Sequence, residues 1–241
     1  MYYGNWRGVV GVIKPTYRPG SLEEMIRLLP EGIGVIPLFL GIKTGGEKER
    51  LDALETVKMK VAELARLNVD LIHPEGAGVF MLRGYKGAEE IVRALETEHG
   101  IPIVTTSMVL VEALRALGVK RMLVVGYLEG EINQKYARYL MDAGFEVLGW
   151  EAISAAFADL GRVPSNEIYA FAKKHYLRYP DAQGILMIGS GWRVLNMIQV
   201  LEQDLQVPVV QAVPARVWAI QKRLHVRQPV KGYGRLLEEM P

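Results

Sequence analysis

The order strand, glycine loop, helix, strand, helix occurs twice in this chain, and this repeat limits the possible folds more than any other feature of the sequence. The first copy spans residues 71–119 and contains the loop Gly76-Ala77-Gly78. The second copy spans residues 185–226 and contains the loop Gly189-Ser190-Gly191. We interpret the two copies as an internal duplication. The alternative is that α/β proteins repeat such units without being duplicated.

In both copies the glycine loop follows an apolar segment. Residues 184–195 show the pattern most clearly, because four apolar residues run into the glycines and a helical pattern follows. Such a run predicts a buried parallel strand, and the loop after it lies at the carboxyl edge of a sheet, where open α/β folds bind ligands. Two duplicated units can face each other about a pseudo-twofold axis, so we expect both loops to line one cleft.

The composition is typical of a globular protein without a polyanionic partner. Half of the 241 residues are hydrophobic, which is ample for a core, and the formal net charge is only +2. No basic cluster is longer than a few residues, so neither nucleic acid nor a membrane is expected as a partner. The chain shows no export signal and no stretch of about 20 apolar residues, so we expect a cytoplasmic protein.

The chain contains no cysteine, which excludes disulfides, thiolate metal sites and thiol nucleophiles. The four histidines are scattered, and no two of them have the spacing of metal ligands, so no metal is expected. The P-loop pattern is absent. The GxG at Gly189 lacks the third glycine and the acidic partner of a dinucleotide site, which argues against such a cofactor.

Strands alternate with helices along the chain, which predicts the α/β class with parallel sheets flanked by helices. We expect two pseudo-twofold-related lobes, each with a four-stranded parallel sheet. The first lobe would comprise residues 1–106 plus 213–241 and the second residues 107–212, because the chain crosses between the lobes once in each copy of the repeat. A single continuous sheet of all the strands would contradict this fold.

Polar side chains near the ends of predicted strands are candidates for chemistry. His73 and Glu75 follow one strand, Tyr127 follows another, and Ser190 lies in the second glycine loop. A carboxylic acid or imidazole acts as a general acid or base when its pKa is tuned toward neutrality. Each residue also has a structural alternative: His73 could close a strand end, Tyr127 could pack, and Ser190, which lacks the GxSxG elbow, could serve as a hydrogen-bonding group.

Residues 105–110, 114–121 and 232–236 make the chain resemble a known group of enzymes. Together with the two glycine loops, they are similar to the aspartate/glutamate racemase superfamily over nearly the whole chain. Within it the arylmalonate decarboxylases are the most similar, followed by the maleate cis-trans isomerases. The resemblance implies an enzyme without metal or organic cofactor. Such enzymes hold a carboxylate in a cradle of backbone amides and hydroxyls, stabilise an enediolate, and move a proton or release carbon dioxide.

Carried over position by position, the resemblance places the cradle in both glycine loops. Its donors would be the amides of Ala77, Gly78, Gly189 and Ser190 and the hydroxyl of Tyr127. The substrate site would also include Pro15, Gly76 and Gly191. Donors aimed at the developing charge of an enediolate are usually the largest single contribution to this kind of catalysis.

The chain departs from the family pattern where the family has cysteines. Racemases and isomerases carry a cysteine in each loop, and the decarboxylases keep the second as proton donor, whereas Gly76 and Gly189 occupy these positions here. Thiol-based racemisation by two bases is therefore excluded. Ala77 and Gly78 replace a threonine and a serine of the family. Lys43 replaces an apolar wall residue, so we expect it to contact a second carboxylate.

The expected function is a cofactor-independent decarboxylase of a small malonate-type carboxylate, in which Glu75, His73 or Ser190 replaces the cysteine as proton donor. A cysteine-free isomerase or racemase-like enzyme is the alternative within the superfamily. A protein that binds small carboxylates without catalysis is the alternative outside the enzymes. The sequence leaves the substrate, the proton donor and the oligomeric state open.

Overall fold

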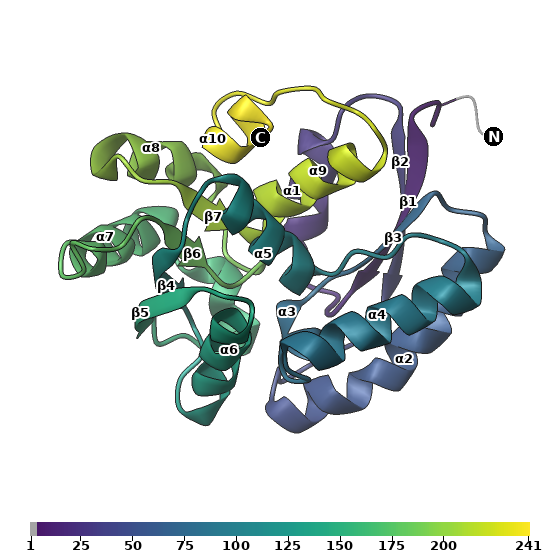
Figure 1. Cartoon of the computed structure of the whole chain (residues 1–241), viewed down its shortest axis with the longest axis horizontal. Coiled ribbons are helices and arrows are strands. Elements are labelled where there is room, and N and C mark those ends of the chain that lie inside the picture. Colours follow the sequence, from purple (N-terminus) through teal and green to yellow (C-terminus); the bar gives the residue numbers. More distant parts are fainter. Residues whose placement is uncertain (1–3) are drawn as a thin grey trace.

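The computed structural model describes residues 4–241 and consists of two separate parallel sheets with helices packed around them (Figure 1). One sheet has the strand order β2-β1-β3 and the other the order β5-β4-β6-β7, which confirms the predicted α/β class. The strands are β1 Gly8–Lys14, β2 Ile33–Phe39, β3 Leu71–Pro74, β4 Arg121–Gly126, β5 Glu146–Ala152, β6 Ile185–Met187 and β7 Val209–Gln211. The lobe boundaries given above stay a prediction, and their first three residues lie outside the described part of the chain.

Helices separate most of the strands along the chain, as parallel pairing requires. They are α1 Ser21–Leu28, α2 Glu47–Arg66, α3 Ala77–Met81, α4 Tyr85–His99, α5 Thr106–Ala116, α6 Glu131–Asp142, the 3-10 helix η1 Phe157–Arg162, α7 Ser165–Tyr176, α8 Leu195–Leu205, α9 Ala212–Arg223 and α10 Arg235–Glu239. The spacing of Leu54, Val57, Val61 and Leu64 gives α2 one apolar face, which is buried in contact with β1 and β3. Within residues 4–241, no helix combines the length and the apolar character that crossing a lipid bilayer requires.

The first sheet has three strands rather than the expected four. At the position of the fourth, a single parallel bridge joins Ile103 to Ile72. The Ile72 N–H donates to the Pro102 carbonyl at 2.9 Å, and the Val104 N–H donates to the Ile72 carbonyl at 3.0 Å. Pro102 has no N–H to extend the ladder, and α5 begins at Thr106, so the segment lies in the place of a strand without the length of one.

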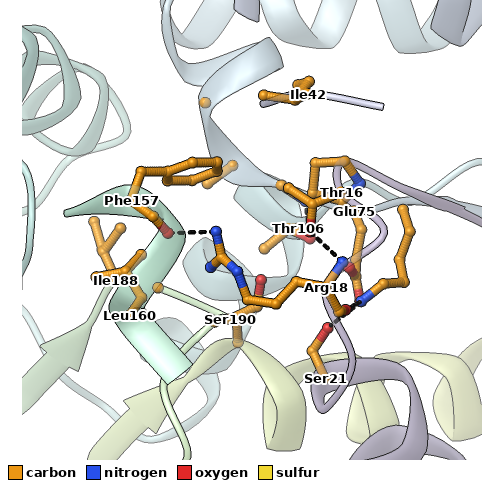
Figure 2. A pocket seen from close by; sticks show the side chains of 18 of the residues that line it. Thr16, Arg18, Ser21, Ile42, Glu75, Thr106, Phe157, Leu160, Ile188 and Ser190 are labelled. Carbon is orange, nitrogen blue, oxygen red and sulfur yellow. Dashed lines mark hydrogen bonds between the residues drawn. The ribbon is translucent and has the colours of Figure 1, made fainter. Parts of the chain in front are cut away.

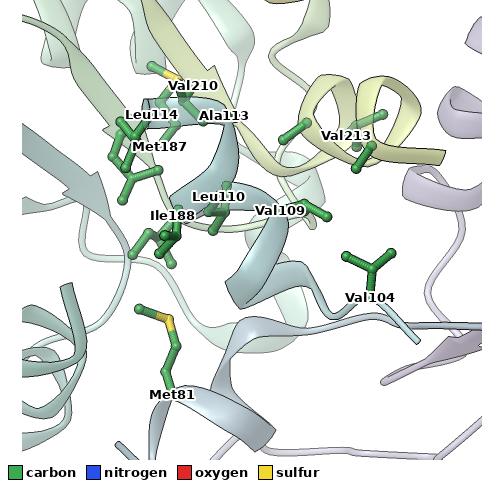
Figure 3. Close-up of a cluster of buried hydrophobic side chains, with 14 of the residues drawn as sticks. Met81, Val104, Val109, Leu110, Ala113, Leu114, Met187, Ile188, Val210 and Val213 are labelled. Atoms are coloured by element: carbon green, nitrogen blue, oxygen red, sulfur yellow. The ribbon is translucent and has the colours of Figure 1, made fainter. Parts of the chain in front are cut away.

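The helices α5 and α9 pack against each other in the middle of the molecule (Figure 1). Both also contact β7, and α9 continues onto α1 beside the first sheet. Figure 3 shows side chains of α5 grouped with those of the second sheet, where Leu110, Leu114, Met187 and Val210 are buried. Residues on nearly every side of α5 are buried, because layers of structure cover it on more than one side.

Gly11 provides a test of how closely α2 packs on the first sheet. A Cβ at Gly11 would lie 2.7 Å from a methyl carbon of the buried Leu64. We expect Gly11→Ala to lower the free energy of unfolding by about 1–3 kcal/mol through overpacking. The effect should be smaller in a Leu64→Ala background, because the cavity admits the extra methyl group. Denaturant unfolding of the four proteins measures this coupling, and strict additivity would contradict the contact.

Candidate active site

A pocket lies where the carboxyl ends of strands from both sheets come together. Lys14 ends β1, Glu75 follows β3, Tyr127 follows β4, and Ile188 follows β6, and all four side chains line the pocket. Parallel α/β folds bind ligands at this edge of their sheets. The pocket is therefore the candidate active site of the chain.

The structure places most of the predicted site residues in the wall of this pocket. They are Pro15, Glu75, Gly76, Ala77, Gly78, Tyr127, Gly189, Ser190 and Gly191. Both glycine loops thus border one space. His73 and Lys43 are not part of the wall.

Gly76 and Gly189 adopt backbone conformations that favour glycine. Gly76 has a φ of 90°, and a Cβ there would lie 3.2 Å from Cγ of Pro15. Gly189 has a φ of 140°, and a Cβ there would lie 3.1 Å from the ring of Tyr127. Because neither loop carries a side chain at these positions, its backbone lies open to a ligand in the pocket.

His73 lies behind the pocket wall and is fully buried. Its Nε2 is 3.3 Å from Oγ1 of Thr106, and the same Oγ1 accepts a hydrogen bond from the Gly76 N–H at 3.2 Å. Burial, and then the nearby guanidinium of Arg216, lower the pKa of His73 to about 3. The ring is therefore neutral at physiological pH, and its contact with Thr106 helps to anchor the first glycine loop.

Lys43 lies in an exposed turn next to α2. Its backbone N–H donates to Oε1 of Glu49 at 2.7 Å, and the N–H groups of Thr44 and Gly45 donate to the other oxygen of the same carboxylate. These bonds lower the pKa of Glu49 to about 2. The turn is thus held as a unit outside the pocket wall.

Lys14 is a pocket residue that we did not predict from the sequence. It ends β1, only 3% of it is exposed, and its Nζ donates to the Arg18 carbonyl at 2.8 Å and to Oγ of Ser21 at 3.0 Å. Burial, and then Arg216, lower the pKa of Lys14 to about 8. One sequence signal points to it: a lysine at the end of an otherwise apolar strand, directly before Pro15.

Two arginines complete the cationic part of the wall. Arg18 donates to the Phe157 carbonyl and lies over the Phe157 ring, 4.7 Å from its centroid, as Figure 2 shows. Arg50 of α2 is buried, donating from Nε to the Gly45 carbonyl at 2.6 Å and from Nη2 to the hydroxyl of Tyr127 at 3.2 Å. Its position four residues before Leu54 places Arg50 on the buried face of α2, which is a sequence signal that we did not use.

Tyr136 of α6 also lines the pocket, next to the first glycine loop. A Cβ at Gly78 would collide with the Tyr136 hydroxyl and with the side chain of Arg50. The buried hydroxyl lies beside the guanidinium of Arg50, and burial raises the pKa of Tyr136. Tyr136 therefore brings a hydroxyl group next to the first glycine loop from a different helix.

Glu75 forms a buried ion pair with Arg216 of α9. Both side chains are almost fully buried, and Arg216 also donates from Nε to the Ala212 carbonyl at 3.2 Å. Burial lowers the pKa of Arg216 to about 9, which still leaves the guanidinium charged at neutral pH. The pair therefore presents Glu75 as a carboxylate, with its Oε2 unpartnered among the described residues.

The described wall has an excess of positive charge. Lys14, Arg18 and Arg50 face the pocket, whereas Glu75 is its one acidic residue and is neutralised by Arg216. Such a pocket favours a small anion, and above all a dianion. No group of three or more His, Asp or Glu residues within the described chain has an arrangement suited to a metal ion.

The family model for arylmalonate decarboxylase matches residues 10–237. The chain belongs to the arylmalonate decarboxylase family. It is 29% identical over 233 residues to an arylmalonate decarboxylase from Bordetella bronchiseptica, covering 95% of this chain and 96% of that protein. A maleate isomerase from Nocardia farcinica is 30% identical over 133 residues, or 54% of this chain and 52% of that one.

A crystal structure of arylmalonate decarboxylase superposes with a TM-score of 0.85 at 25% identity, covering 96% of this chain and 99% of that chain. The fold of the arylmalonate decarboxylase family is thus present over nearly the whole chain. The matched relatives are decarboxylases and isomerases, so family membership indicates an enzyme of related chemistry. It confirms the superfamily resemblance drawn from the sequence.

Single and double substitutions of the buried ion pair should change the free energy of unfolding by different amounts. Glu75→Gln leaves Arg216 buried without a counter-charge, so we expect it to lower the free energy of unfolding by about 3–5 kcal/mol. The double variant Glu75→Gln/Arg216→Met should regain most of that stability, because no unpaired charge remains. Denaturant unfolding at pH 7 measures both, and a Glu75→Gln protein as stable as the wild type would contradict the pair.

Proposed function

We propose that the chain is a cofactor-independent decarboxylase of small malonate-type dicarboxylates. The observation that carries the proposal is the pocket itself, in which two bare glycine loops and three cationic side chains surround one space. A malonate is a dianion whose two carboxylates lie on one carbon. One carboxylate fits the backbone loops, and the other fits the cationic side of the pocket.

The first glycine loop leads into α3, where the N–H groups of Ala77 and Gly78 belong to the first turn and have no acceptor within the helix. In our proposal these amides, the amides of Gly189 and Ser190, and the hydroxyl of Tyr127 hold the carboxylate that remains. Loss of carbon dioxide leaves an enediolate on that carboxylate. Fixed donors that face this developing charge stabilise the transition state.

Apolar side chains complete the wall and support loss of carbon dioxide over simple binding. They are Ile42, Leu110, Phe157, Leu160 and Ile188. These side chains limit the access of water to the bound malonate, so the carboxylate that leaves is poorly hydrated, whereas the neutral carbon dioxide that it becomes needs no hydration. An aryl or alkyl substituent on the malonate carbon can occupy the same apolar surface.

A substrate panel tests the function directly. The purified protein would be incubated in deuterium oxide with chelator and with phenylmalonate, methylmalonate, maleate, aspartate or glutamate. We expect release of carbon dioxide from a substituted malonate and one deuterium on the α-carbon of the product. Conversion of maleate to fumarate would instead assign an isomerase, and α-deuterium exchange of an amino acid a racemase.

The same panel separates catalysis from binding. Binding of malonates by calorimetry, with no turnover and no deuterium exchange, would assign a non-catalytic carboxylate-binding protein. Activity that requires an added metal ion would contradict the cofactor-independent proposal. The chelator removes adventitious metal ions from the standard assay, so a requirement for added metal would be detected.

Arg50 tests whether the pocket recognises a second carboxylate. Loss of a hydrogen bond to a charged group costs about 1.5–3 kcal/mol, so we expect Arg50→Gln to raise KM for the active malonate by about 10–100-fold. Arg66→Gln is the matched control, because Arg66 ends the same helix and is exposed. Steady-state kinetics on the three proteins give the comparison, and equal KM values for Arg50→Gln and wild type would argue against this contact.

A further inference from the structure

We propose that Lys14 is the general acid that delivers a proton to the substrate carbon, in the role for which the family uses a cysteine. The inference rests on the proposed function and assigns the proton donor of that same pocket. It follows from the position of the ammonium group, from its hydrogen bonds, and from the state of the other candidate donors.

The ammonium of Lys14 is held in place and has one N–H left to donate. Within residues 4–241, its Nζ has only two acceptors, the Arg18 carbonyl and Oγ of Ser21. The side chain lines the pocket although only 3% of the residue is exposed. Because two N–H bonds point to the protein, the third is available to a bound ligand.

A chain of contacts ties this ammonium to the buried ion pair. Ser21 accepts from Lys14 at 3.0 Å and donates to Oε1 of Glu75 at 3.5 Å, and Glu75 pairs with Arg216. Figure 2 shows Ser21 and Glu75 together on the side of the pocket away from Ile188 and Leu160. The network positions the ammonium and leaves Glu75 as a positioning residue.

The other candidate donors suit the step less well. Glu75 is held as a carboxylate by Arg216, so it has no proton to give. His73 is neutral and lies behind the wall. The hydroxyl of Ser190 lines the pocket but is a weak acid without a base beside it to restore its proton.

Charges around Lys14 make its ammonium a stronger acid. Arg216 from α9 and Arg18 from the loop after β1 lower its pKa, Glu23 of α1 opposes them, and Glu75 faces it across Ser21. Burial is the largest cause, and together these effects set the pKa of Lys14 at about 8. A donor with a pKa near the working pH is both protonated and able to release its proton.

The proposed reaction needs no cofactor to supply or accept electrons. The bond between the α-carbon and one carboxylate breaks, carbon dioxide leaves, and the electron pair remains as the enediolate. A Lys14 N–H bond then breaks, its proton forms the new C–H bond, and the monocarboxylate product leaves. The neutral amine of Lys14 regains a proton from water before the next turnover.

The test compares wild type, Lys14→Met and Lys14→Arg with phenylmalonate as the probe. Lys58→Met is the matched control, because Lys58 is exposed on α2 and, among the described residues, pairs only with Glu55. We expect Lys14→Met to lower kcat by about 10²-fold or more, since general acid catalysis typically contributes that factor. KM should rise as well, because the substitution removes one of the three cations of the pocket. Lys14→Arg keeps the positive charge, yet its guanidinium holds its proton too firmly, so its kcat should also fall.

The pH profile separates proton donation from a structural role. Because the ammonium form is the donor and is lost as pH rises, wild-type kcat should fall above about pH 8. This alkaline limb should be absent from the residual activity of Lys14→Arg. Circular dichroism and thermal unfolding at pH 7 check the fold, and Lys14→Met should be no less stable, because it removes a buried charge.

The possible outcomes distinguish a failure of the role of Lys14 from a failure of the proposed decarboxylase function. An active wild type with Lys14→Met equally active, or with an unchanged alkaline limb in Lys14→Arg, overturns the role of Lys14 alone. A wild type inactive on the whole substrate panel overturns the proposed function and this inference with it.

Discussion

The buried ion pair between Arg216 and Glu75 is the interaction on which the pocket depends. It joins α9, which follows the second sheet, to the loop that follows β3 of the first sheet. Burial, and then this guanidinium, lower the pKa of both His73 and Lys14. One buried cation thus holds the two halves of the site together and adds to the effect of burial on the pKa values of its neighbours.

Most of the charged groups of the site come from elements other than the two glycine loops. The loops keep bare backbone at Gly76 and Gly189, while charged groups enter from β1, α2 and α9. Tyr136 fills the space next to Gly78 with a hydroxyl from a different helix. The pocket wall is therefore assembled from the ends of both sheets and from helices of both halves of the chain.

The repeat in the sequence was enough to predict both sheets and the meeting of the two glycine loops, since local patterns of apolar and glycine residues determine these features. The shortened fourth strand depends on Pro102 and on where α5 begins, which periodicity does not reveal. Helical spacing places Arg50 on the buried face of α2, but its contact with Tyr127, which lies in the second half of the chain, could not be predicted from that spacing. Lys14 also had a local signal, a lysine closing an apolar strand.

The distance between Glu75 and Arg216 along the chain also bears on how the protein is made. The first sheet is complete long before the ribosome has synthesised α9. Until that helix arrives, the carboxylate of Glu75 must remain hydrated, because burial without a counter-charge is too costly. Assembly of the pocket therefore belongs to the last stage of folding, after nearly the whole chain has emerged, and a nascent chain that lacks α9 cannot contain this binding site.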